Sequence, residues 1–320
     1  MPGSIMNDDS LLEQIEREVG PIVQHASFDD ALFHYTNATG LAGILKDKQI
    51  WATHCRHLND YAELSIGEST IDLAAADIID AKSTTEGQRS IIERFRKSHQ
   101  SASTTRIADV FVASFSKNGN DLSQWRAYGS DGGGYSVGIS RFHLPSGGIT
   151  RTDANMALWL CKCQYDVDAF REEARDLLRR LAQGCERYIN AYARDAARLQ
   201  NILEKFLVVM LRHAGTLVPR LKHPAFEKEQ EWRLIAVPMP GHEDAVTQYR
   251  PSPFGVVPYL PVDLCEAGEP LAVAEVFVGP TLDPIAGVEA ARGLLRKAGY
   301  SDGLVRSSGI PYRSRNHRGT

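Results

Sequence analysis

Apolar residues recur at three- to four-residue spacing in several stretches of the chain, which is the pattern of amphipathic α-helices. In residues 166–193 they fall at i, i+4, i+7, i+8 and i+11: Phe170, Ala174, Leu177, Leu178 and Leu181. The same spacing predicts helices at 9–19, 37–49, 58–82, 83–99, 197–215 and 283–299. We therefore expect a helical insertion at about 166–219, between two parts that are richer in strands.

Runs of β-branched and aromatic residues predict the strands. These runs lie at residues 31–36, 50–54, 106–116, 135–141, 231–238, 255–264 and 273–281. Their spacing is irregular and does not follow the regular βαβ alternation of a doubly wound fold. The pattern favours the α+β class, with a mixed or antiparallel sheet and helical insertions.

These elements suggest three parts of the chain. We expect an N-terminal helix or extension over 1–30 and a single α+β domain over 31–304, which carries the helical insertion. Residues 305–320, VRSSGIPYRSRNHRGT, contain four Arg and one His but no acidic residue. Their composition predicts a basic, flexible tail.

Charge and cysteine content exclude some classes of protein. The formal net charge of −4 argues against a general nucleic-acid coat or a basic membrane-surface protein. No apolar run approaches the ~18 residues needed to span a membrane, and the start MPGSIMNDDS does not resemble a signal peptide. The five Cys suit neither a disulfide framework nor a zinc ribbon. We expect reduced thiols, no membrane partner and a cytoplasmic protein.

Rare residue types gather in several short segments. The predicted strand LFHYT contains His34, which is either a buried structural imidazole or a site residue. A second segment follows a predicted strand and offers hydroxyls, aromatic faces and a guanidinium: Ser114, Ser116, Gln124, Trp125, Arg126 and Tyr128. Aromatic faces stack on flat rings, and Arg binds phosphate through a bidentate fork. For Trp125, packing in the core is the alternative.

The segment EKEQEWRL alternates in polarity. If its strand begins near Glu229, then Glu229, Glu231 and Arg233 share one face while Trp232 lies on the other. Such a face is either a solvated edge or a cleft in which the Arg keeps a carboxylate ionised. A carboxylate in a cleft can stabilise a developing cation or accept a proton.

Several common catalytic motifs are absent from the sequence. Gly132 to Gly134 fit neither a Walker nor a Rossmann loop, and there is no G-x-S-x-G or H-E-x-x-H motif. His54, Cys55 and His57 are only a weak zinc pattern.

The order of the motifs is more specific than any one of them. FHYT, LND, FVASFSKNGNDLSQWRAYGSDGGGYSVGI, HPAFEKEQEWRL and VAEVFVGP together resemble the bacterial family filed as domain of unknown function 2971. The resemblance covers about residues 32–300 and is least typical in the helical insertion. That family looks like a divergent branch of the ADP-ribosyltransferase-like fold, which implies a split sheet that binds NAD, as substrate, in a cleft.

This resemblance implies roles for individual residues. His34 would bind a ribose, and Tyr135, Tyr128 and Ser114 compete for the place on the middle strand. Glu231 would stabilise the oxocarbenium cation that forms when the nicotinamide–ribose bond breaks, with Glu229 as an alternative or helper.

The remaining contacts to NAD are also implied by the resemblance. Arg126 or Arg233 would hold the pyrophosphate, and Trp125 is an aromatic candidate for stacking. Tyr35 is a further candidate, although alternation along its strand turns it away from His34, where packing is its expected role. Trp51 is expected in the core, and Asn59 or Asp60 at a helix cap.

The first hypothesis is an enzyme that transfers ADP-ribose to a protein, a nucleic acid or a small acceptor, or that hydrolyses NAD, as a toxin or in phage defence. Two alternatives remain. One is a non-catalytic nucleotide-sensing module on the same scaffold. The other is a hydrolytic effector that binds Mg²⁺ through Asp60, Glu229 and Glu231.

Overall fold

The structure is a computed structural model that describes residues 30–58, 61–105, 110–141, 155–239, 241–252, 255–281 and 283–312. The helix expected at 9–19 and the pair Asn59–Asp60 lie outside these residues. The chain forms two compact units. Of the described residues, those between 55 and 110 and between 164 and 224 form the helical unit, and those between 30 and 54, 111 and 163, and 225 and 312 form the sheet unit.

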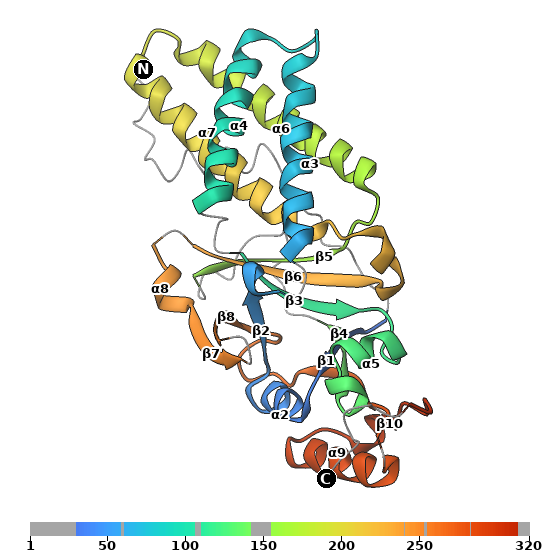
Figure 1. Ribbon diagram of the computed structural model, residues 1–320. Helices are drawn as coiled ribbons and strands as arrows, with labels where there is room; N and C mark the ends of the chain where they lie inside the picture. The colour runs from blue at the N-terminus through green and yellow to red at the C-terminus, as the bar shows by residue number, and fades with distance from the viewer. Residues whose placement is uncertain are drawn as a thin grey trace. The chain divides into compact units, whose positions relative to one another are not determined.

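The helical unit is built from four long helices that run side by side (Figure 1). They are α3 (Tyr61–Asp80), α4 (Glu86–Thr105), α6 (Val167–Tyr192) and α7 (Ala196–Leu217), with the short 3₁₀ turns η1 (Cys55–His57) and η3 (Val218–Arg220). Asp166 begins α6 by accepting hydrogen bonds from the amides of Asp168 and Ala169. The five apolar residues predicted for α6 are all buried, so its predicted amphipathic face is confirmed.

This unit differs from the single insertion expected at 166–219. Helices α6 and α7 occupy that segment, but α3 and α4, from residues 55–110, belong to the same compact unit. Arg96 of α4 and Arg171 of α6 both form bidentate ion pairs with α3, through Asp72 and Asp77. The sequence could not reveal this pairing because the two helical segments lie far apart along the chain.

The sheet unit contains a mixed sheet, and the predicted α+β class is confirmed. Its strands are β1 (Leu32–Thr36), β2 (Gln49–His54), β3 (Phe111–Ser116), β4 (Tyr135–Arg141), β5 (Met156–Lys162), β6 (Glu231–Pro238), β7 (Gln248–Ser252), β8 (Gly255–Asp263), β9 (Ala272–Val278) and β10 (Val305–Ser307). Its helices are α2 (Ala38–Asp47), α5 (Leu122–Ala127), α8 (Glu243–Val246) and α9 (Pro284–Lys297). Its 3₁₀ turns are η2 (Ser130–Gly132), η5 (Asp302–Leu304) and η4 (Pro224–Glu229), the last starting at the unit boundary.

Strand β3 is the branching point of this sheet. One edge of β3 pairs with β6 along its whole length, from Phe111 opposite Ala236 to Ser116 opposite Glu231. The other edge is shared by two strands, because β2 pairs at Phe111 and Val112 whereas β1 pairs at Ser116. Strands β1 and β2 therefore separate from each other beside the middle of β3.

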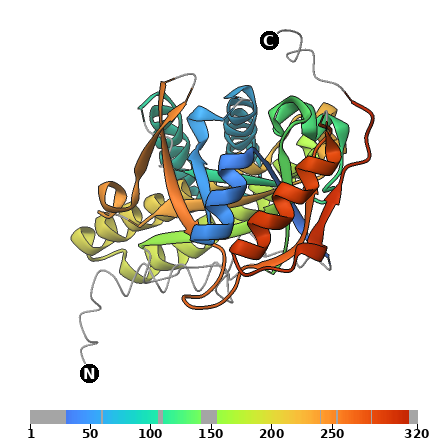
Figure 2. The ribbon, with the colours of Figure 1, turned by 90° about the horizontal axis from the view of Figure 1, so that it is seen from below.

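The apolar core lies on one face of the sheet, under α2 and α9, which Figure 2 shows side by side across the strands. Leu41, Ile44 and Leu45 of α2 and Leu295 of α9 pack there against strand residues. Both helices begin at a side-chain cap. Asn37 accepts a hydrogen bond from the amide of Gly40, and Asp283, which precedes Pro284, accepts one from the amide of Ala286.

The end of the chain differs from the expected tail at 305–320. Val305–Ser307 form β10, which pairs in parallel with β9, and Val305 is buried. Ser308 donates its amide to Val278 and accepts a hydrogen bond from the side chain of Asn120. The sequence showed the basic composition but not this pairing, so the start of the tail was placed too early.

Two further expectations need revision. Trp51, expected in the core, is 44% exposed, because β2 turns Ile50 and Ala52 towards the core and Trp51 to the opposite face. Strands β5 and β7 were not predicted. In the described part of the chain, no helix has the length and apolarity to cross a membrane.

Candidate functional site

A narrow cavity of about 60 Å³ lies where the sheet branches. Ten residues line it, from β1, β3, the region of α5 and the start of β6: Phe33, His34, Tyr35, Ser114, Phe115, Ser116, Gln124, Tyr128, Glu229 and Glu231. Six of the ten predicted site residues are among them. They are His34, Tyr35, Ser114, Tyr128, Glu229 and Glu231.

His34 occupies the gap between the two strands that share the edge of β3. Ser114 lies midway between Val112, which pairs with β2, and Ser116, which pairs with β1. Backbone groups of a strand alternate between its edges, so the carbonyl of Ser114 faces this gap. Nδ1 of His34 donates to that carbonyl oxygen over 2.9 Å. The imidazole therefore supplies a contact that a neighbouring strand would otherwise make.

The hydrogen bond also fixes the state of the ring. Burial lowers the pKa of His34, and the nearby charge of Arg250 acts in the same direction, although the bond to Ser114 opposes them. A neutral imidazole with its proton on Nδ1 has an acceptor at Nε2. His34 is thus prepared to accept a hydrogen bond from a ligand hydroxyl. The Phe115 ring packs 5.7 Å from it, centroid to centroid.

In β3 and β6 the polar side chains lie on one face of the sheet and the apolar side chains on the other, as the alternation along EKEQEWRL predicted for β6. Ser114 lies opposite Arg233, and Ser116 lies opposite Glu231, which places these four side chains on one face. Phe115 and Trp232 belong to the apolar core on the other face.

Glu231 and Arg233 form a buried ion pair along β6. Nε of Arg233 donates to Oε1 of Glu231 over 2.7 Å, and a second guanidinium nitrogen donates to Oε2 over 3.2 Å. Their side chains are 6% and 5% exposed. A carboxylate has more lone pairs than this Arg uses, so Glu231 keeps acceptor capacity while its orientation is fixed. The interpretation of the segment as a solvated edge is wrong, because both residues are buried.

Glu229 reaches the same cavity by a different route from the one predicted. It is the last residue of η4, and β6 begins only at Glu231. Gln230 between them has φ +45°, in the left-handed region, which breaks the alternation that was expected to continue. The carbonyl of Glu229 accepts a hydrogen bond from Ser116 Oγ over 2.8 Å, which joins η4 to β3.

Tyr35 and Tyr128 contribute to the cavity in different ways. The Tyr35 hydroxyl donates to the carbonyl of Asn118 and accepts from the amide of Asp121, so it holds the loop before α5. Burial raises the pKa of Tyr35. Tyr128, at the end of α5, is 40% exposed and offers an aromatic surface at the cavity. Tyr128 is therefore better suited than Tyr35 to stack on a ligand.

The structure places the other four predicted residues elsewhere. Trp125 is fully buried, donates to Asn120 and packs edge-on against Tyr35, so it is a core residue. Tyr135 packs against the apolar core. Arg126 lies over the Tyr312 ring.

Arg233, the fourth of these residues, was expected to hold a pyrophosphate. Its guanidinium is committed to Glu231 inside the protein, so that expectation is wrong.

Four residues that line the cavity were not predicted as site residues. Ser116 and Gln124 belong to the polar run noticed in the sequence, but nothing there distinguished them from their neighbours. Phe33 and Phe115 resemble ordinary strand residues. They line the cavity because the sheet branches beside them, and the sequence around them carries no pattern that would indicate this.

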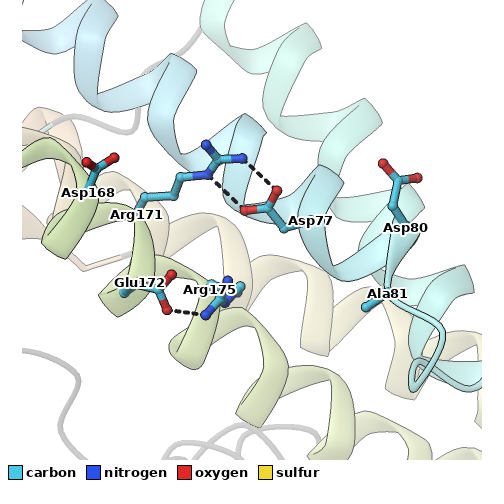
Figure 3. Close-up of a pocket in the computed structure, with 7 residues that line it drawn as sticks. All are labelled: Asp77, Asp80, Ala81, Asp168, Arg171, Glu172 and Arg175. Atoms are coloured by element: carbon cyan, nitrogen blue, oxygen red, sulfur yellow. Dashed lines mark hydrogen bonds and ion pairs between the residues drawn. The ribbon is translucent and has the colours of Figure 1, made fainter.

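A second hollow, an open groove of about 550 Å³, lies in the helical unit between α3 and α6 (Figure 3). Apart from Ala81 its lining is charged. Arg171 reaches across to Asp77, whereas Glu172 pairs with Arg175 on its own helix. An open groove of paired surface charges lacks the apolar walls of a small-molecule site.

In the described part of the chain none of the five cysteines forms a disulfide, and Cys161 and Cys163 of the CKC segment are buried. Among the described residues, no group of three or more His, Cys, Asp and Glu side chains is arranged to hold a metal ion. Asp60, part of the predicted Mg²⁺ site, lies outside these residues.

Fold and cavity together define an α+β protein with a histidine and two carboxylates at a branch in its sheet. Residues 124–234 match the model of a family described as Protein of unknown function (DUF2971), which supports the resemblance seen in the sequence over that segment. Tyr128, Glu229 and Glu231 lie inside the matched segment, and His34 lies before it. No curated protein and no solved structure matches the chain.

Proposed function

We propose that the protein is an ADP-ribosyltransferase-like enzyme that uses NAD as substrate. It would transfer ADP-ribose to a protein, a nucleic acid, a small acceptor or water. One observation carries this proposal: His34, Tyr128, Glu229 and Glu231 come from separate parts of the chain and line one cavity. The separation of β1 and β2 beside β3 is also consistent with the split sheet of that fold.

The chemistry of these groups suits cleavage of a nicotinamide–ribose bond. The bonding electron pair leaves with the nicotinamide nitrogen, and positive charge develops on the ribose. A fixed carboxylate beside the ribose stabilises that charge. Glu231 is such a group, because Arg233 holds both of its oxygens. An acceptor then bonds to the ribose carbon and gives up a proton, for which Glu229 is the nearby base.

His34 and Tyr128 would orient the substrate rather than react with it. Nε2 of a neutral His34 accepts a hydrogen bond from a ribose hydroxyl, while Tyr128 stacks on the nicotinamide ring. A positioned substrate reacts faster because less orientational freedom is lost at the transition state.

The size of the cavity limits what can enter it. Pockets that enclose a drug-sized ligand have volumes of about 300–1,000 Å³, whereas this cavity measures about 60 Å³. We propose that only the reacting end of NAD enters it, with the phosphates and adenine outside. None of its lining residues is an arginine or lysine.

The isosteric substitution Glu231→Gln tests the proposal. It removes the charge opposite the developing cation and keeps the shape of the side chain. We expect nicotinamide release from NAD by the purified protein to fall by about 100-fold or more. Chromatography of the released nicotinamide measures the rate, and thermal melting with NAD measures binding.

Glu227→Gln is the matched control. Glu227 belongs to the same segment, is exposed on η4 and does not line the cavity, so its loss should leave the rate unchanged. Equal rates for wild-type and Glu231→Gln would remove the role assigned to Glu231. A wild-type protein that binds NAD without cleaving it would favour the sensing module instead. If it neither binds nor cleaves NAD, the proposal fails.

The cellular role is part of the same proposal. An NAD-consuming enzyme can act as a toxin or in phage defence, and we propose that this one does so in the cytoplasm. A loss of cellular NAD on expression of the wild type, and not of Glu231→Gln, would support that setting.

A further inference from the structure

Strands β2, β8 and β7 form one part of the sheet (Figure 1). In this part a cationic side chain lies on two aromatic rings. The guanidinium carbon of Arg250 is 5.5 Å from the centroid of the Trp51 ring and 5.8 Å from that of Tyr259. The two rings are 4.5 Å apart, and Arg250 also donates to Thr53 Oγ1 over 2.8 Å. The guanidinium is thus held in place by a hydroxyl and two rings.

No carboxylate among the described residues pairs with Arg250. In the described part of the chain, its partners are a hydroxyl and two rings. Two other arginines of this unit differ, because Arg233 pairs with Glu231 and Arg306 with Glu275. A partly buried guanidinium without an acidic partner favours binding of an anion, and it matches the geometry of phosphate.

Arg250 lies close to the cavity. Its partner Thr53 is opposite Val112 of β3, two residues before Ser114. Its charge acts on His34 directly, since it helps to lower the pKa of that imidazole. Two strand residues span only ~7 Å, so a group bound at Arg250 and one bound in the cavity can belong to the same small molecule.

The cavity lacks a positively charged group for phosphates, which Arg250 can supply. Its lining offers groups for a ribose and a flat ring but no arginine or lysine for phosphates. Of the two arginines predicted for that purpose, Arg233 is held inside by Glu231. Beside Arg250, the indole of Trp51 is 44% exposed and presents a flat surface to a base.

We propose that Arg250 binds a phosphate of the nucleotide whose ribose end enters the cavity, and that Trp51 stacks on its base. This inference rests on the proposed function, since it assigns the remaining part of the same ligand. It predicts an affinity for ADP, which carries the base and the phosphates but no nicotinamide.

Calorimetric titration of ADP into the full chain tests the inference without a catalytic readout. Arg250→Gln should weaken binding by about 10- to 100-fold and reduce its salt dependence. Trp51→Ala should also weaken it by about 5- to 100-fold, as loss of a base–aromatic stack does. Arg306→Gln removes the same charge from an exposed position of the unit and should change nothing. Thermal melting checks that each variant is folded.

The outcomes separate this inference from the proposed function. If Arg250→Gln binds ADP as tightly as the wild type, or if the wild type does not bind ADP, the phosphate site is refuted. The nicotinamide assay still decides the enzymatic role in either case. If ADP binding depends on Arg250 and Trp51 but NAD is not cleaved, the phosphate site is supported and the enzymatic role is refuted.

Discussion

The buried ion pair of β6 gives a quantitative test of the structure. Arg233→Met keeps the length and apolar stem of the side chain but removes its charge. Glu231 then remains inside the sheet unit, 5% exposed, without the cation that holds both of its oxygens. Removing one partner of a buried pair costs about 3–5 kcal/mol, because the other charge stays in a medium that solvates it poorly. We expect the free energy of unfolding to fall by that amount.

A matched control uses an ion pair of similar length at the surface. Arg296 and Asp302 are 2.7 Å apart, but their side chains are 60% and 47% exposed. Water solvates both charges after either is lost, so Arg296→Met should cost less than about 1 kcal/mol. The contrast between the two variants isolates the effect of burial from that of the ion pair itself.

Urea unfolding followed by tryptophan fluorescence is the suitable assay. All four tryptophans, Trp51, Trp125, Trp159 and Trp232, belong to the sheet unit, so the signal reports on the unit that contains the pair. The variant that carries both Arg233→Met and Glu231→Gln completes a double-mutant cycle. Its loss of unfolding free energy should be smaller than the sum of the losses in the two single variants. A cost for Arg233→Met no larger than that for Arg296→Met would refute the argument, since it would mean that the pair is not buried.

Two further predictions concern buried titratable groups. Burial, and next the charges of Arg212 and Arg180, lower the pKa of His213 in α7 to about 3 from 6.5. The unfolded chain then binds a proton more readily than the folded one, so the contribution of neutral His213 to the free energy of unfolding is complete above pH 6.5 and is lost as the pH falls. Between pH 7.5 and 5, the free energy of unfolding measured with urea should fall by about 2 kcal/mol more for the wild type than for His213→Leu. Equal falls in the two proteins would contradict this prediction. Thiol labelling at pH 8, followed by mass spectrometry, should find Cys265 reacting first. The other four cysteines are buried, and burial raises the pKa of Cys55 to about 11 and that of Cys185 to about 12. If the fast phase of thiol labelling is unchanged in Cys265→Ser, Cys265 is not the first thiol to react.

The residues that sequence patterns predicted best were those with a strong local signal. Helix α6 follows the apolar spacing, and the polar face of β6 follows the alternation from Glu231 onward. Each of these features depends on interactions within a few residues, which a single sequence contains.

The features that were missed depend on distant parts of the chain. Strand β7 is largely exposed and takes its form from pairing with β8, so its sequence QYRPS has no strand pattern of its own. Strand β5 is buried on both faces, so its sequence does not alternate between apolar and polar residues. A short apolar run of this kind can be either a buried strand or a buried helix segment. Arg250 was overlooked because its aromatic partner Trp51 precedes it by almost two hundred residues.

The way in which the helical unit is connected has a consequence for changes in chain length. Residues 55–110 join β2 to β3, and residues 164–224 lead from β5 to β6. Both pairs are antiparallel neighbours, with His54 opposite Phe111 and Lys162 opposite Trp232. Each helical segment is thus a very long hairpin loop, and the entropy of closing a loop grows slowly with its length. A change in the length of either segment should therefore cost little loop-closure entropy, because the strand pairings on each side of it are made by the strands themselves.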